Sequence, residues 1–248
     1  METLLAIGTL AVGLLFIGGT FMTGIYFATV STERTVASVV AEEAFAKMLL
    51  DDPNVAGLSA TVLTPYEQVG TLADADFIYP STSETSAGQY SWAALCRRTN
   101  ASSDLVQFTV FVCRKAGAGS KYWMRVDGAA PPRLAASTRP RPVRVSIVQD
   151  TAGTAEVGIV DAVATDRVDE RGFINDGASI VDEATGQIYR VLSRPADRPD
   201  TIILDRPWVA PLAAVGGAVW VVPPAISGGR NPVVGVYQKT FRIPGTGL

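Results

Sequence analysis

The sequence predicts an α+β fold, in which one long N-terminal helix carries a headgroup of antiparallel β-sheet with two β subdomains. Three observations lead to this prediction. The first 50 residues lack proline and change from a charge-free apolar run to an amphipathic pattern. The rest of the chain alternates β-rich runs with turns that draw on its 23 glycines and 15 prolines. A Pro/Arg-rich segment divides this β part. We assign residues 1–54 to the helix, 55–130 to a first β domain, 131–142 to a linker and 143–248 to a second β domain.

The N-terminal apolar run is long enough to cross a membrane. No charged residue lies between Glu2 and Glu33, and a spanning helix needs about 20 apolar residues. No lysine or arginine precedes the run, whereas a secretory signal peptide begins with a basic region. From Glu33 to Leu50 apolar residues recur at helical spacing, and Glu43 and Lys47 form a favourable i,i+4 pair. We expect one uninterrupted helix of about 70 Å, with a membrane-compatible half and a water-compatible half.

The opening residues METLLAIGTLAVGLL resemble the start of type IV pilins and type II secretion pseudopilins, and the AVGLL segment is most similar to minor pilins. Members of this family combine an early glutamate, a charge-free helix and a long amphipathic extension, and the resemblance covers residues 1 to 50. Aligning Glu2 with the family's glutamate implies that three mature residues and a basic leader precede Met1. It also implies that the N-terminal amine of a neighbouring subunit matches Glu2, since a buried carboxylate needs a compensating charge.

Small residues in the apolar run predict where neighbouring helices pack, because glycine lets helix backbones approach closely. The candidate packing positions are Gly8, Gly13, Gly18, Gly19 and Gly24, together with Thr20 and Thr23. The alternative is a plain signal anchor on a solitary envelope protein.

The composition excludes several classes of function. The chain has no histidine, which removes the commonest general base and rules out Ser-His-Asp and Cys-His catalytic sites. Its net charge of −3 and pI of about 5.1 give no basic surface that favours nucleic acid. Carboxylate chemistry stays open, but no motif selects a residue for it. We therefore expect no enzyme activity, no cofactor and no bound metal.

The first β region contains a strong hairpin signal. Tyr90–Arg98 and Leu105–Lys115 are β-rich runs joined by a short polar turn, which predicts an antiparallel pair. One register places Cys96 opposite Cys113, at a separation that suits a disulfide. An even number of cysteines after an export-type segment favours an oxidising compartment and a Cys96–Cys113 disulfide. Two buried free thiols are the alternative. Lys121–Val126 is expected to add a strand to the same sheet.

Residues 143–248 contain recurrent short strands with Gly/Pro turns, which predict a sandwich or a small barrel. Ser179–Leu192 is a second predicted hairpin. An acidic cluster offers the oxygen ligands that calcium prefers. Its spacing matches no EF-hand loop and arginines interrupt it, so we interpret it as a solvated, salt-bridged loop. Its members are Asp161, Asp166, Asp169, Glu170, Asn175 and Asp176. The arginines of the linker are likewise interpreted as solvated.

The resemblance implies a structural subunit of an extracellular type IV pilus-like filament, which polymerises through its N-terminal helix and displays its β domains outward. The expected partners are further copies of the chain in a helical homopolymer, other pilins and the inner-membrane assembly machinery. The chain would reside in the inner membrane before assembly and at the cell surface afterwards. One alternative is a minor pseudopilin of a type II secretion system. Another, of a different class, is a signal-anchored envelope enzyme or binding protein.

Overall fold

One helix and thirteen strands define the architecture of the residues that the structure describes. The computed structural model describes residues 2–51, 53–55, 57–80, 88–100, 103–117, 119–126, 133–149, 153–161, 168–209 and 217–243. The helix is α1 (Glu2–Leu50), and three short 3₁₀ helices are η1 (Tyr66–Gln68), η2 (Asp74–Phe77) and η3 (Glu170–Phe173). The strands are β1 (Thr64–Pro65), β2 (Ile78–Tyr79), β3 (Tyr90–Arg98), β4 (Leu105–Arg114), β5 (Tyr122–Val126), β6 (Arg133–Ser137), β7 (Val143–Val148), β8 (Glu156–Val160), β9 (Ser179–Asp182), β10 (Ile188–Ser193), β11 (Thr201–Leu204), β12 (Gly217–Val221) and β13 (Val233–Arg242).

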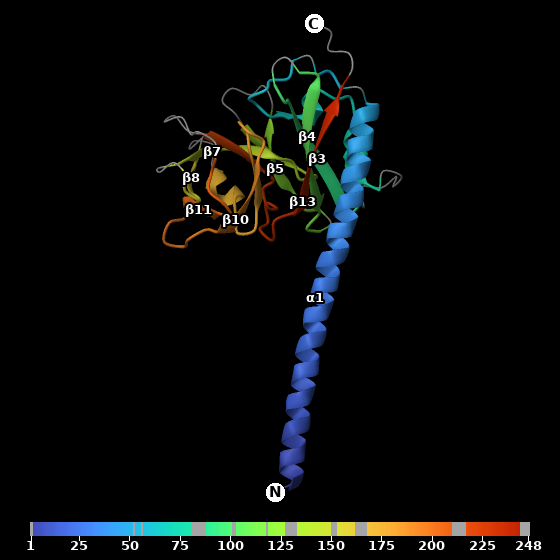
Figure 1. Ribbon diagram of the computed structural model, residues 1–248, viewed down its shortest axis with the longest axis vertical. Coiled ribbons are helices and arrows are strands. Elements are labelled where there is room, and N and C mark those ends of the chain that lie inside the picture. The colour runs from blue at the N-terminus through green and yellow to red at the C-terminus, as the bar shows by residue number, and fades with distance from the viewer. Residues whose placement is uncertain are drawn as a thin grey trace.

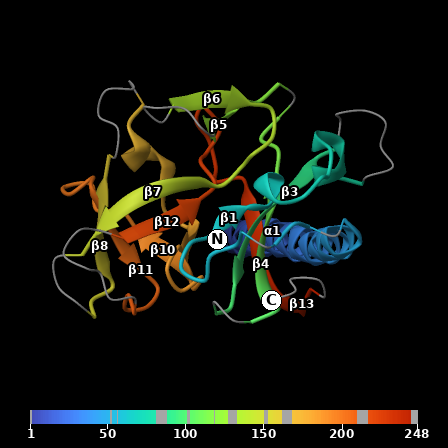
Figure 2. The same cartoon turned by 90° about the horizontal axis from the view of Figure 1, so that it is seen from above.

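The predicted α+β class and the single long helix are confirmed. The helix α1 is continuous over 49 residues, about 74 Å at the usual helical rise. Its C-terminal part lies along the β headgroup, and its N-terminal part projects beyond it as a bare rod (Figure 1). Viewed along the helix, the central sheet lies between α1 and a β-barrel (Figure 2).

The central sheet has the order β1-β3-β4-β13, with β2 also paired to β3. The predicted hairpin is confirmed, because β3 and β4 pair antiparallel from Tyr90 opposite Arg114 to Arg98 opposite Val106. Both faces of these strands are covered. Trp92 and Phe108 face α1, whereas Leu95 faces the barrel. This double coverage explains why β3 reads as a nearly continuous apolar run.

The expected Cys96–Cys113 disulfide is wrong, and both cysteines are buried free thiols. In the observed register Cys96 lies opposite Phe108, and Cys113 lies opposite Ser91. The two cysteines are therefore five residue pairs apart, about 17 Å along the strands. They also face opposite sides of the sheet, because Cys96 packs in the cluster beneath α1 and Cys113 in the cluster against the barrel. Burial raises the pKa of each thiol to about 12.

The second β region forms the small barrel that the sequence allowed. Six strands close in the order β10-β11-β8-β7-β12-β9, and the predicted hairpin at Ser179–Leu192 is β9 paired with β10. Alternate residues of each strand point inward. On β7, for example, Val143, Val145 and Ile147 are buried between more exposed neighbours.

The barrel and the sheet share an apolar contact and a polar one. Val181 and Trp220 on the outside of the barrel pack with Phe111 of the sheet. The β9–β10 turn also docks on the sheet, where Arg97 Nη1 donates a hydrogen bond to the carbonyl oxygen of Ala184 at 2.7 Å. Gly186 in this turn has a φ of +71°, and an added Cβ would lie 2.9 Å from the side-chain oxygen of Gln107. This close approach accounts for the glycine.

The connections differ from the sequence expectation in two ways. The strand β5 pairs with β6, within the predicted linker, and forms a separate two-stranded sheet. Because β3 and β13 occupy both edges of β4, β4 leaves no edge for β5. The last strand, β13, leaves the barrel region and pairs with β4, so residues 143–248 do not all belong to the barrel. Two separate subdomains therefore remain a prediction, as do the domain boundaries.

Candidate functional site

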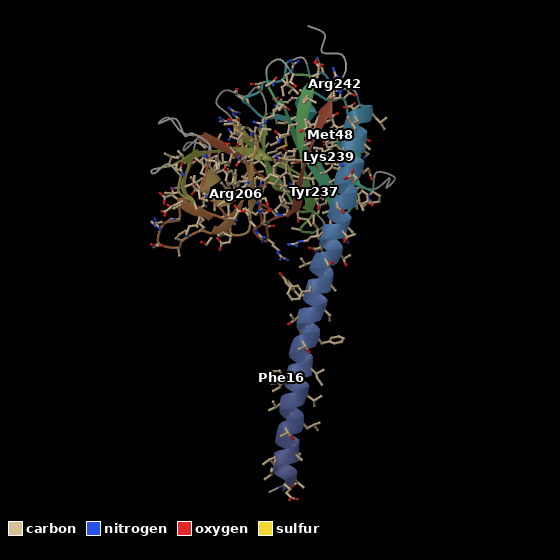
Figure 3. The ribbon with its side chains drawn as sticks, viewed as in Figure 1. Phe16, Met48, Arg206, Tyr237, Lys239 and Arg242 are labelled. Carbon is tan, nitrogen blue, oxygen red and sulfur yellow. The ribbon has the colours of Figure 1, made fainter. Side chains whose placement is uncertain are left out.

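The N-terminal part of α1, residues 2–32, is the most distinctive surface of the molecule, and we call it the apolar half. Every residue from Glu2 to Thr29 is exposed. Large apolar side chains are bare over the whole circumference, with exposed fractions of 76% for Leu15, 72% for Phe16 and 78% for Met22. Figure 3 shows Phe16 on this isolated rod, far from the headgroup. By length and composition, this helix could cross a membrane.

Five threonine hydroxyls of the apolar half are satisfied within the helix. The hydroxyl of Thr23 donates to the carbonyl oxygen of Gly19 at 2.9 Å, and that of Thr29 donates to Ile25 at 2.9 Å. Thr9, Thr20 and Thr32 make equivalent bonds one turn back. Hydroxyls bonded in this way can enter an apolar environment at little cost, since no donor is left unpaired.

The glycines of the apolar half have no packing role within the chain. A Cβ added at Gly8, Gly13, Gly18, Gly19 or Gly24 would meet nothing within 4 Å. Glycine inside a helix costs about 1 kcal/mol relative to alanine, and no contact of the described chain offsets that cost. Positions 11 residues apart lie on one face, since 11 residues make about three turns.

Two helix faces therefore carry glycines in register. One face carries Gly8 and Gly19, and the other carries Gly13 and Gly24, while Gly18 lies apart from both. Gly19, Thr20 and Thr23 line a hollow on the bare helix between Leu15 and Phe16. The predicted packing positions thus remain available to a neighbouring helix. The structure places Glu2 exposed in the first turn, where a carboxylate interacts favourably with the helix dipole.

The C-terminal part of α1, residues 33–50, is built into the head, and we call it the packed half. Its buried residues are Ala37, Val40, Ala41, Ala44, Phe45 and Met48. They pack against β3, β4 and β13, and the Phe45 ring meets the Phe241 ring edge-on with centroids 5.8 Å apart. Lys239 Nζ lies over the Phe45 ring and pairs with the Glu42 carboxylate. Figure 3 shows Met48, Tyr237 and Lys239 along this seam.

The packed half is fixed at both ends by polar contacts. Near its start, Arg114 at the end of β4 pairs with Glu33. At its end, the Asp51 carboxylate accepts hydrogen bonds from Tyr66 Oη at 2.7 Å and from the Thr71 backbone at 2.8 Å. Burial alone would raise the pKa of Asp51, but the hydrogen bonds from Thr71 and Tyr66 outweigh it and lower that pKa. The head thus holds this half in one orientation.

Buried ion pairs in the head were not found by sequence reasoning. Arg139, in the predicted solvated linker, is only 4% exposed, and it pairs with Glu67 and Asp74 at 3.0 Å each. Its guanidinium also stacks on the Phe77 ring. The interpretation of Arg139 as solvated is wrong, because the chain brings carboxylates from η1 and η2 to it.

The acidic cluster of the barrel is partly dispersed into ion pairs. Asp169 pairs with Arg171, and Asp176 accepts a hydrogen bond from the Arg194 backbone. Glu170 is fully buried and pairs with Arg125 of β5 at 2.5 Å. Asp166 lies outside the described residues. Among the residues that the structure describes, no group of three or more metal-ligating side chains is assembled.

Comparisons with known proteins add no assignment: no family model matches the chain, and neither the curated proteins nor the solved structures contain a match. The candidate functional site therefore rests on geometry, as a bare apolar rod with open glycine positions, joined rigidly to a folded head.

Proposed function

We propose that the chain is a structural subunit of a type IV pilus-like filament, which resides in a membrane through its apolar half and polymerises through that same surface. The observation that carries the proposal is the division of one continuous helix. Its first half is bare and apolar on all sides, and its second half is built into the head. A bare apolar surface of this extent needs lipid or protein to cover it in water.

The glycine pattern favours protein as the final partner of this surface. A helix that only anchors a protein in lipid gains nothing from glycines that contact no other group. Helix-to-helix packing uses them, because close backbone approach increases dispersion contacts between helices. We infer that neighbouring copies pack along the two glycine faces, and that the β head forms the outer wall of the filament.

Glu2 supplies the sharpest test of the proposal. We expect Glu2→Ala to abolish filaments in sheared cell-surface material viewed by electron microscopy, while the chain stays in the membrane fraction. Glu2→Asp, which keeps the charge, is the matched control and should retain assembly. Wild-type levels of filaments from Glu2→Ala would refute the charge-matching account.

The same preparation separates the proposal from its alternatives. Long filaments composed mainly of this chain support the filament subunit. Scarce hetero-complexes would instead indicate a pseudopilin at the tip of a secretion apparatus. A membrane-bound monomer, with no self-association in either preparation, would overturn the proposal in favour of a signal-anchored envelope protein.

A further inference from the structure

The end of the head that adjoins the apolar half carries a cluster of basic residues. Two loops meet there, residues 114–121 between β4 and β5, and residues 226–232 before β13. Neither loop contains an aspartate or a glutamate. We call this cluster, with one arginine of the helix, the basic lip. Its members are Arg34, Arg114, Lys115, Lys121 and Arg230.

The two loops are fixed to each other and to the helix. The backbone N–H of Arg114 donates to Pro232, and that of Ile226 donates to Lys121, at 2.8 Å each. The Ala116 N–H donates to Tyr122 Oη at 2.8 Å. The ion pair between Arg114 and Glu33 places the lip beside the first charged residue that follows the charge-free run of the helix.

The exposure of the lip suits contact with a surface below it. Arg34, Lys121 and Arg230 are exposed. Ile226, at the start of the second loop, is 41% exposed and is followed by a serine and two glycines. Exposed cations on the same two loops as an exposed apolar side chain match the interface of an anionic membrane, where phosphate groups overlie acyl chains.

The length of the apolar half would place the lip at the membrane interface. Residues 3–32 span about 45 Å as a helix, and a bilayer with its headgroups is about 40–45 Å thick. A helix that fills the bilayer with these residues therefore places Glu33 and the lip at the outer phosphates.

We propose that the basic lip binds the phosphate groups of anionic lipids, and thereby fixes how deeply α1 sits in the membrane before assembly. This inference rests on the membrane-resident state of the proposed subunit. Each lysine or arginine held near an anionic membrane strengthens the attraction between protein and membrane. Added salt screens the charges and weakens this attraction. Extraction of the subunit into a filament would then require release of these lipid contacts.

The test uses the full chain reconstituted in vesicles, with a fluorescent thiol label at Ile226→Cys. The native cysteines are fully buried, so the reagent selects residue 226. The vesicles contain phosphatidylcholine alone, or phosphatidylcholine with a minority of phosphatidylglycerol, and each carries a nitroxide quencher on lipid headgroups. We expect about threefold stronger quenching in the anionic vesicles, falling toward the neutral level at high salt. Equal quenching in both vesicles would overturn the proposal.

Charge reversal identifies the residues responsible. In the anionic vesicles, Lys121→Glu with Arg230→Glu should reduce quenching to the neutral-lipid level. Arg242→Glu is the matched control, because this exposed arginine lies at the opposite end of the head (Figure 3), and it should change nothing. The near-UV circular dichroism of each variant verifies that the head is folded. If the double variant contacts lipid normally but assembles poorly, the lip binds a neighbouring subunit and the lipid proposal is wrong.

Resistance of the membrane-bound chain to alkaline extraction distinguishes failure of the lipid proposal from failure of the filament proposal. A chain that resists extraction but shows no lip contact would overturn the lipid proposal and leave the filament proposal standing. A chain that is extracted has no stably inserted helix, and both proposals would fall.

Discussion

The two halves of α1 have the same backbone conformation and opposite environments. Within the described residues the apolar half has no buried side chain, whereas the packed half buries six residues against β3, β4 and β13. The difference lies in how apolar side chains are distributed. They surround the first half, and they occupy one stripe in the second, with Glu42 exposed beside that stripe. Hydrophobicity on one face thus builds the helix into its own domain, and hydrophobicity on every face leaves it for lipid or another chain.

The comparison predicts its largest contrast for two phenylalanines on the same helix. Phe45 is 2% exposed and Phe16 is 72% exposed. We expect Phe45→Ala to lower the free energy of unfolding of the head by about 3–5 kcal/mol, through a cavity opposite Phe241. Phe16→Ala should change it by less than about 0.5 kcal/mol. Denaturation in mild detergent, followed by the fluorescence of the four tryptophans, measures both values, since all four lie in the head. Similar losses for the two variants would contradict the division of the helix.

Glycine substitutions should reverse that contrast, because they affect association and leave the head unchanged. Gly13→Leu and Gly24→Leu add side chains where the described chain leaves space, so the stability of the head should not fall. Close helix packing should weaken, because leucine holds apart the backbones that glycine lets approach. Resonance energy transfer between labelled full-length chains in detergent measures this association. Ile25→Leu, on a face without these glycines, is the control. Unchanged association in both glycine variants would show that these faces do not pack.

The end of the packed half should give a smaller, pH-dependent effect. The hydrogen bonds from Thr71 and Tyr66 lower the pKa of Asp51 in the folded chain. A lowered folded pKa gives stability that is present above the unfolded value of about 4 and is lost as pH falls through the folded value. We expect Asp51→Asn to cost about 1 kcal/mol at neutral pH. The gap between variant and wild type should narrow below about pH 4 in acid unfolding monitored by fluorescence.

Glu2→Gln is the matched control for this measurement. Glu2 lies at the exposed end of the apolar half, so its replacement should leave the acid unfolding curve of the head unchanged. A gap between wild type and Asp51→Asn that widens toward low pH would contradict the assigned role of the Asp51 carboxylate.

The sequence predicted the local elements well, because each depends on neighbours in the chain. The continuous helix follows from the absence of proline and from its apolar pattern, and the β3–β4 hairpin follows from two β-rich runs around a short turn. The hairpin register was not predictable in the same way. Both faces of these strands are buried, so no alternation of polar residues marked which cysteine faced which side.

Long-range pairing was the second limit. Nothing near Val233 indicates that β13 returns to β4 across the whole barrel sequence. The partners of Arg139 come from η1 and η2, which lie 72 and 65 residues away in the sequence. Composition alone therefore suggested a solvated linker. The packing role of the glycines in the apolar half stays a prediction, because the described chain places no partner beside them.

The smallest expected effect concerns the ion pair between Lys239 and Glu42 at the seam. Glu42 is 66% exposed and Lys239 is 40% exposed, and solvent screens such pairs to about 0–1 kcal/mol. We expect Glu42→Gln to cost about 0.5 kcal/mol in head stability, with less effect at high salt. A double-mutant cycle with Lys239→Gln isolates the pair from the contact of Lys239 with the Phe45 ring. A coupling energy above about 2 kcal/mol would exceed what exposed pairs give, and it would mean that charge, rather than the buried stripe from Ala37 to Met48, fastens the packed half to the head.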